Sequence, residues 1–193
     1  MKTLIIIPSR LSATRLPGKP LLKINNISII SHVFKKAKDA NIGEVIVAAE
    51  DEEIVNDVKN NGGNAILTSN KHKTGTDRIY EAYQKLNLDN VDFIMNLQGD
   101  EPAINIQDIT NLNQMMIEHK AKIGTLAAKV EDKSDLANEN IVKVITENNL
   151  EDVPFSKAKI FLRKSEDTSN IYHHIGIYCY SLQILKNLSL IHI

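Results

Sequence analysis

The chain has 193 residues, of which 42% are hydrophobic, and its 23 basic and 24 acidic side chains give a net charge of −1. This length fits one domain over residues 1–193, and the balanced charge argues against general attraction to nucleic acid or to an anionic membrane. The one cysteine excludes an internal disulfide and no apolar stretch approaches the roughly 20 residues of a membrane helix, so we expect a cytoplasmic protein with neither a nucleic-acid nor a membrane partner.

Short β-branched runs alternate with longer helical patterns along the chain. Strands are expected at 4–7, 44–49, 65–68, 93–97, 124–130, 142–145 and 175–180, and helices at 28–40, 51–60, 77–86 and 106–119. The first run, Leu4 to Ile7, is continuously apolar and is typical of a strand buried on both faces. The alternation predicts a three-layer α/β domain with a mixed, mostly parallel sheet that binds ligands at the carboxyl ends of its strands. The charged, least regular stretch, 151–170, is expected to form an exposed arm or lid.

A basic loop follows the first expected strand. It reads PSRLSATRLPGKP from Pro8 to Pro20, and its polar residues include Arg10, Ser12, Thr14, Arg15 and Lys19. Arginine binds two phosphate oxygens in a fork, lysine acts as a point charge, and glycine lets backbone N–H groups approach an anion. The loop therefore predicts a polyphosphate site, with a solvated basic loop as the alternative. Its spacing matches neither a Walker P-loop nor GxGxxG.

Two further motifs follow later strands. His72 to Arg78 reads HKTGTDR and is expected to lead into a helix capped by Thr76 or Asp77, whose first N–H groups bind an anion or a carbonyl oxygen. Asn96 to Pro102 reads NLQGDEP, and Asp100 is its candidate Mg²⁺ ligand, because Mg²⁺ takes a few carboxylates together with substrate phosphates and water. An ordinary helix start and an ordinary polar turn are the respective alternatives.

Together these motifs resemble those of the sugar nucleotidyltransferases. The loop is similar to the PARxxSTRLPGKPL signature, HKTGTDR to HxSGTxR and NLQGDEP to NvQGDEP, while HHIGIYCY at 173–180 is similar to HxGIYgY. Within that family the chain most resembles the cytidylyltransferases that activate 3-deoxy-D-manno-octulosonate (Kdo), a sugar acid. The resemblance implies a fold of the nucleotide-diphosphosugar transferase type, which is Rossmann-like.

The resemblance also implies a role for each motif. The nucleotide CTP would be bound by Arg10, Ser12, Thr14, Arg15, Lys19, His72, Thr74, Gly75, Thr76 and Arg78, of which Arg78 reads the base edge. The implied catalytic residues are Lys19, Arg15 and Asp100, with Asp100 holding Mg²⁺. The sugar acid would be bound by Gln98, Lys157 and His174, where Lys157 replaces the usual arginine of the family.

The implied reaction is CTP + Kdo → CMP-Kdo + diphosphate, a step of lipopolysaccharide biosynthesis. Full-length relatives are implied to be homodimers. The motifs end near residue 180, and the family segments that supply a second Mg²⁺ ligand and a dimer helix have no counterpart, so we expect a C-terminally truncated member. Two alternatives stay open: a transferase for another sugar acid or nucleotide, and a non-catalytic remnant that binds nucleotide.

Overall fold

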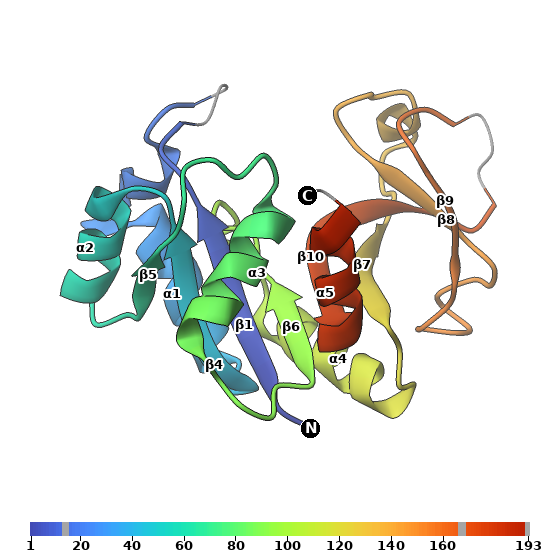
Figure 1. Cartoon of the computed structure of the whole chain (residues 1–193). Helices are drawn as coiled ribbons and strands as arrows, with labels where there is room; N and C mark the ends of the chain where they lie inside the picture. The colour runs from blue at the N-terminus through green and yellow to red at the C-terminus, as the bar shows by residue number, and fades with distance from the viewer. Residues whose placement is uncertain (13–15, 166–168, 192–193) are drawn as a thin grey trace. The chain divides into compact units, whose positions relative to one another are not determined.

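The computed structural model describes residues 1–12, 16–165 and 169–191 (Figure 1). The chain divides into two compact units, one formed by Met1–Gly124 with Ile177–Ile193 and the other by Thr125–Gly176. The single domain expected over residues 1–193 stays a prediction.

The first unit is built on a sheet with β1 (Thr3–Ser9) at its centre. On one side β1 pairs in parallel with β4 (Gly43–Ala49), which in turn pairs in parallel with β5 (Ala65–Leu67). On the other side β1 pairs in parallel with β6 (Phe93–Asn96), and residues 178–181 of β10 (Ile171–Ser181) pair antiparallel with β6. Within this unit the expected mixed and mostly parallel sheet is confirmed.

Helices cover both faces of this sheet (Figure 1). They are α1 (Ile29–Asp39), α2 (Glu52–Asn60), α3 (Gly75–Leu86), α4 (Ile106–Glu118) and α5 (Leu182–Ile191). On one face, Leu4 and Ile6 of β1 pack in an apolar cluster with Ile79 of α3 and Leu185 of α5. On the other face, α1 contacts β1, β4, α2 and α4. Since alternate strand residues point to opposite faces, this double cover explains why the whole run from Leu4 to Ile7 is buried.

The contact between β1 and β4 leaves no room for a side chain at Gly43. A Cβ atom there would lie 1.9 Å from the carbonyl oxygen of Thr3, which is a backbone atom and cannot move aside without opening the ladder. The expected strand at 44–49 therefore begins one residue earlier, at a position that only glycine fits.

Several short elements were not predicted from the pattern of apolar residues. After the basic loop come the 3-10 turn η1 (Lys19–Leu21) and a two-stranded hairpin of β2 (Lys23–Ile24) and β3 (Ile27–Ser28). Each of them has only two or three residues, which is too few for a helical or strand pattern to repeat. Within the described ranges, no helix combines the length and the apolar character needed to cross a bilayer.

The second unit contains residues 125–129 of β7 (Ile123–Lys129), η2 (Lys133–Leu136), β8 (Lys143–Thr146), β9 (Ala158–Leu162) and residues 171–176 of β10. Strand β8 pairs antiparallel with both β9 and β10.

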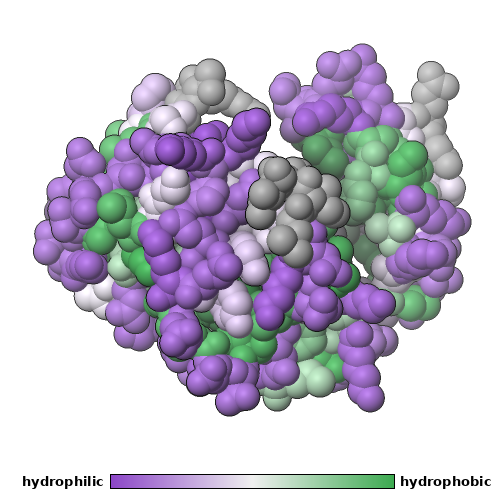
Figure 2. Space-filling model, viewed as in Figure 1, coloured by the Kyte–Doolittle hydropathy of each residue, from purple (hydrophilic) through white to green (hydrophobic). Residues whose placement is uncertain are grey.

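The prediction of an irregular arm over 151–170 is corrected, because part of this stretch is the strand β9. The side chains of β9 are largely exposed. Apolar surface is visible on this unit in Figure 2, and Ile160 and Phe161 are among its exposed residues.

A fully buried lysine organises the second unit. The Lys143 ammonium group donates hydrogen bonds to the carbonyl oxygens of Asn138, Ile141 and Arg163 at 2.6, 2.9 and 2.6 Å. Three carbonyl acceptors compensate for the loss of water around the buried charge. Lys143 thereby joins the turn before β8 to the end of β9.

Candidate functional site

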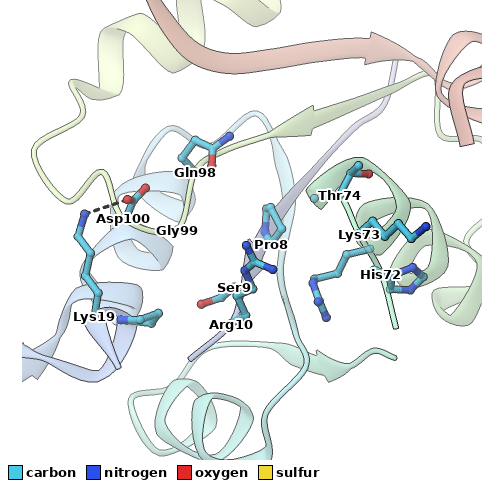
Figure 3. Close-up of a pocket in the computed structure, with 13 residues that line it drawn as sticks. Pro8, Ser9, Arg10, Lys19, His72, Lys73, Thr74, Gln98, Gly99 and Asp100 are labelled. Atoms are coloured by element: carbon cyan, nitrogen blue, oxygen red, sulfur yellow. Dashed lines mark hydrogen bonds and ion pairs between the residues drawn. The ribbon is translucent and has the colours of Figure 1, made fainter. Parts of the chain in front are cut away.

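A cavity of about 330 Å³ opens at the carboxyl ends of β1 and β6 in the first unit (Figure 3). Its wall is formed by Pro8, Ser9, Arg10, Lys19, Pro20, His72, Lys73, Thr74, Gly75, Arg78, Gln98, Gly99 and Asp100. These residues come from the basic loop and from the HKTGTDR and NLQGDEP motifs. The motifs meet because β1 and β6 run in parallel, so that the loops following both strands leave from the same edge of the sheet.

The basic loop after β1 is closed on itself and anchored to the end of β4. Gly18 adopts a φ of 70°, in the left-handed region that favours glycine, and its N–H donates to the carbonyl oxygen of Leu11 at 3.0 Å. The N–H of Leu11 donates to Asp51 Oδ2 at 2.8 Å. The Ser12 hydroxyl donates to Glu50 Oε1, also at 2.8 Å. Ser12 is thus an anchor of the loop and is not among the residues that form the cavity wall.

Lys19 faces Asp100 across the cavity mouth. The Lys19 Nζ lies 2.8 Å from Asp100 Oδ2, the ion pair drawn as a dashed line in Figure 3, and the two side chains are 33% and 50% exposed. An ion pair this exposed contributes at most about 1 kcal/mol to stability. An incoming phosphate can therefore replace the carboxylate as the partner of Lys19 at little cost, which leaves Asp100 free to bind a cation.

Thr74 begins the helix behind the second motif. Its Oγ1 accepts a hydrogen bond from the N–H of Asp77 at 3.2 Å and donates one to Asp77 Oδ2 at 2.6 Å, so Thr74 is the N-cap of α3. The expected cap at Thr76 or Asp77 is wrong by two or three residues. Thr76 instead hydrogen-bonds to Tyr180, whose pKa burial raises to about 12.

Arg78 is buried and held by three acceptors. Its guanidinium donates to Thr68 Oγ1 at 2.6 Å, to the carbonyl oxygen of Ser69 at 3.1 Å and to the carboxylate of Glu50. Because Glu50 also accepts from Ser12, one carboxylate ties the basic loop to the start of α3. Arg78 lines the cavity, and its role as reader of the base edge stays a prediction.

His72 is fixed by a second acidic residue. Its Nε2 contacts the carboxylate of Glu81, which also accepts from Lys85 at 2.7 Å and from the N–H of Ser69 at 2.9 Å. Burial alone would raise the pKa of Glu81, but the hydrogen bonds from Lys85, His72 and Ser69 outweigh it and lower this pKa to about 2. Glu81 thus stays ionised and orients the His72 ring at the cavity wall.

Glu50, Asp51 and Glu81 support the site although no sequence motif marks them. Glu50 and Asp51 directly follow a buried strand, and that position was the available signal. The helix predicted over 51–60 begins at Asp51, which does stand at the N-cap position of α2, whereas Glu50 was assigned no role. Glu81 lies on α3 at a spacing that also suits a surface ion pair with Lys85, so nothing in the sequence set it apart.

Two proposed sugar-acid ligands lie in the second unit. The Nε2 of His174 lies 3.0 Å from Thr125 Oγ1. The His174 ring contacts the Phe161 ring edge-on, with the ring centroids 5.0 Å apart. Burial, together with the charge of His173, lowers the pKa of His174. Lys157 is exposed, and its Nζ lies 3.4 Å from Glu147 Oε1.

The third proposed sugar-acid ligand, Gln98, is on the cavity wall of the first unit. Thr14 and Arg15 lie outside the described residues.

The carboxylate of Asp100 on the cavity wall suits a metal that binds together with substrate. Among the described residues there is no cluster of three or more histidine, cysteine or acidic side chains that would hold a metal alone. Asp100 is the carboxylate of the described cavity wall. One carboxylate fits Mg²⁺, which takes its remaining ligands from phosphates and water, better than it fits a metal that needs a preformed cage of protein ligands.

Comparison with known proteins identifies relatives over nearly the whole chain. The cytidylyltransferase family model matches residues 4–192, and so continues beyond residue 180, where the recognisable motifs end. The 3-deoxy-manno-octulosonate cytidylyltransferase of Thermodesulfovibrio yellowstonii is 43% identical over 97% of this chain and 78% of its own length. The enzyme of the same name from Fusobacterium nucleatum is 42% identical over 93% of this chain and 73% of its own length.

A solved structure shares the same fold. The structure of CMP:2-keto-3-deoxy-manno-octonic acid synthetase complexed with CTP superimposes with a TM-score of 0.88 at 35% sequence identity. The match covers 98% of this chain and 78% of that one.

Replacing Glu50 tests the buried anchor. We expect Glu50→Gln to lower the free energy of unfolding by about 3 kcal/mol, because it leaves the buried guanidinium of Arg78 without its counter-charge. The control is Glu139→Gln, which removes the charge from an exposed ion pair with Lys164 and should change the same quantity by less than about 0.5 kcal/mol. Urea unfolding measures both variants, and equal losses would contradict the structural role of Glu50.

The lowered pKa of Glu81 predicts that part of the unfolding free energy is lost in acid. Its pKa is about 2 in the folded chain against 4.5 for the free side chain, so its contribution is complete above pH 4.5 and is lost as the pH falls toward 2. Between pH 6 and pH 3 the wild type should lose about 1 to 2 kcal/mol more unfolding free energy than Glu81→Gln, after allowance for solvent screening. Glu118→Gln, which alters an exposed carboxylate, is the control and should follow the wild type. Parallel pH profiles for wild type and Glu81→Gln would rule out this contribution.

Proposed function

The chain belongs to the cytidylyltransferase family, and on that basis we propose that it transfers CMP from CTP to Kdo with release of diphosphate. The observation that carries the proposal is the cavity at the ends of β1 and β6, which gathers Arg10, Lys19 and Asp100 from two separate motifs. Its size and its cations suit a nucleoside triphosphate. The similarity to Kdo cytidylyltransferases supports the choice of CTP and of the sugar acid.

The geometry suggests how the chain's own residues act. Arg10 and Lys19 bind the phosphates, and in doing so Lys19 exchanges its carboxylate partner for a phosphate oxygen. The anomeric oxygen of the sugar acid then attacks the α-phosphorus, a new P–O bond forms, and the bond to the β-phosphate breaks so that diphosphate leaves. The hydroxyl proton passes to water. The Lys19 ammonium stabilises the negative charge that develops on the phosphate oxygens during this step.

Asp100 is the proposed ligand of Mg²⁺, which would neutralise phosphate charge and orient the triphosphate when bound. The anchored loop and the N-terminus of α3 would hold the nucleotide on either side, through Thr74 and Gly75 and through the fixed ring of His72. Roles for Thr14, Arg15 and Thr76 in binding CTP, and for Gln98, Lys157 and His174 in binding the sugar acid, stay proposals on the basis of the sequence motifs.

The biological setting is part of the same proposal. A product of CMP and Kdo would feed lipopolysaccharide biosynthesis, as the family resemblance implies. We propose a cytoplasmic location, which is supported by the single cysteine, Cys179, since a free thiol suits a reducing compartment. The homodimer implied for full-length relatives stays a prediction.

The activity test is diphosphate release by the purified chain across substrate pairs. With Mg²⁺ present, we expect turnover with CTP and Kdo and none with UTP and a hexose phosphate. Turnover with CTP and sialic acid in place of Kdo would favour another sugar-acid substrate. Binding of CTP without turnover on any sugar acid would contradict the enzymatic proposal and favour a remnant that only binds nucleotide.

Lys19→Ala separates catalysis from folding. We expect kcat to fall about 100-fold, because the variant loses charge stabilisation of the transition state. The free energy of unfolding should change by less than about 1 kcal/mol, because the lysine is in an exposed ion pair. Lys2→Ala breaks a similarly exposed pair with Glu44 at the opposite end of β1 and should leave kcat unchanged. Equal losses of stability and activity in Lys19→Ala would argue against its assigned role.

A further inference from the structure

Ser9 ends the central strand with a hydroxyl group that has no partner among the described residues. It is 6% exposed, it lies on the cavity wall between Pro8 and Arg10, and its Oγ makes no hydrogen bond within residues 1–12, 16–165 and 169–191. Other buried serines of the first unit are paired: the hydroxyls of Ser28 and Ser31 both donate to Asp57. A buried polar group left unpaired costs free energy, so its persistence on a cavity wall points to a partner that arrives from outside.

The surrounding backbone fixes where this hydroxyl lies. The carbonyl oxygen of Ser9 accepts from the N–H of Glu50, and Ser9 lies opposite Ala49 in the parallel ladder. The loop after β6 presses on the same strand end, because a Cβ on Gly99 would lie 3.0 Å from the carbonyl oxygen of Pro8. Ser9 is therefore held by the sheet, and rotation about its own side-chain bond is the freedom it retains.

The charge around Ser9 defines the kind of partner. Arg10 and Lys19 are cations on the same cavity wall, and in Figure 3 the Ser9 oxygen points to the side of the cavity where Lys19 lies. A hydroxyl among cations is well placed to donate its proton to an anionic acceptor, and phosphate oxygens are strong acceptors of such bonds. A neutral ribose or base would accept a weaker hydrogen bond from this hydroxyl than a phosphate oxygen would.

We propose that the Ser9 hydroxyl donates a hydrogen bond to a phosphate oxygen of the bound nucleoside triphosphate. This inference rests on the proposed function, which supplies the nucleotide. Ser9 is then a binding residue that the motifs did not single out, and it is satisfied only in the nucleotide complex. Its removal should weaken binding without weakening the free protein.

The test compares Ser9→Ala with Ser31→Ala and the wild type. CTP affinity is measured by calorimetry, cytidine affinity by ligand-observed NMR titration, and the Tm of each free protein by calorimetric unfolding. Ser9→Ala should bind CTP about tenfold more weakly, bind cytidine as the wild type does, and keep or raise its Tm. Ser31→Ala, which loses a bond to Asp57, should show a lower Tm and wild-type affinity for CTP.

Three outcomes would overturn the inference in recognisable ways. Unchanged CTP affinity in Ser9→Ala shows that the hydroxyl makes no contact with nucleotide. An equal loss for CTP and cytidine moves the contact from the phosphates to the nucleoside. A wild-type chain that binds no CTP refutes the proposed function itself, and the inference falls with it.

Discussion

The parallel pairing of β1 with both β4 and β6 is the constraint on which the site depends. Because all three strands point the same way, the basic loop, the acidic pair Glu50 and Asp51, and the loop that carries Asp100 all leave from one edge of the sheet. The fully buried run from Leu4 to Ile7 holds that edge in place through apolar cover on both faces. Residues about 90 positions apart thus become neighbours through strand direction alone.

Around that edge, charge is used in two ways that differ in burial. The Arg78–Glu50 pair is buried, and Arg78 also donates hydrogen bonds to Thr68 and Ser69. Breaking this pair would cost much free energy, so it holds the site in one arrangement. The Lys19–Asp100 pair is half-exposed and inexpensive to break, so both partners remain available for a ligand. The same cavity wall carries the Ser9 hydroxyl, which has no partner in the part of the chain that the structure describes, and the ring of His72, which Glu81 orients.

Much of this arrangement was predictable from the sequence, and the rest was not for identifiable reasons. The strand at 4–7 was predicted correctly because a continuous apolar run before a proline has few other interpretations, and the cavity residues Lys19 and Asp100 were predicted because motif spacing marks them. The hairpin β2–β3 is too short for any periodic signal. Strand β9 was missed because it is short, largely exposed and set in a stretch whose other residues are mostly polar or charged. The N-cap of α3 is Thr74 and not Thr76, because the Thr74 hydroxyl accepts from the N–H of Asp77. Residue types alone do not reveal this geometry.

Glu50 and Glu81 were missed because their partners, Ser12, Arg78 and His72, are distant in the sequence or lie on other elements.

The most direct test of the account is a crystal structure of the chain with CTP bound. We predict that the triphosphate occupies the cavity at the ends of β1 and β6, with phosphate oxygens against Arg10 and Lys19 and with the Lys19–Asp100 contact exchanged for a phosphate contact. A nucleotide bound at another surface, or one that places its base where the phosphates are expected, would contradict the central claim that this edge of the sheet is the nucleotide site.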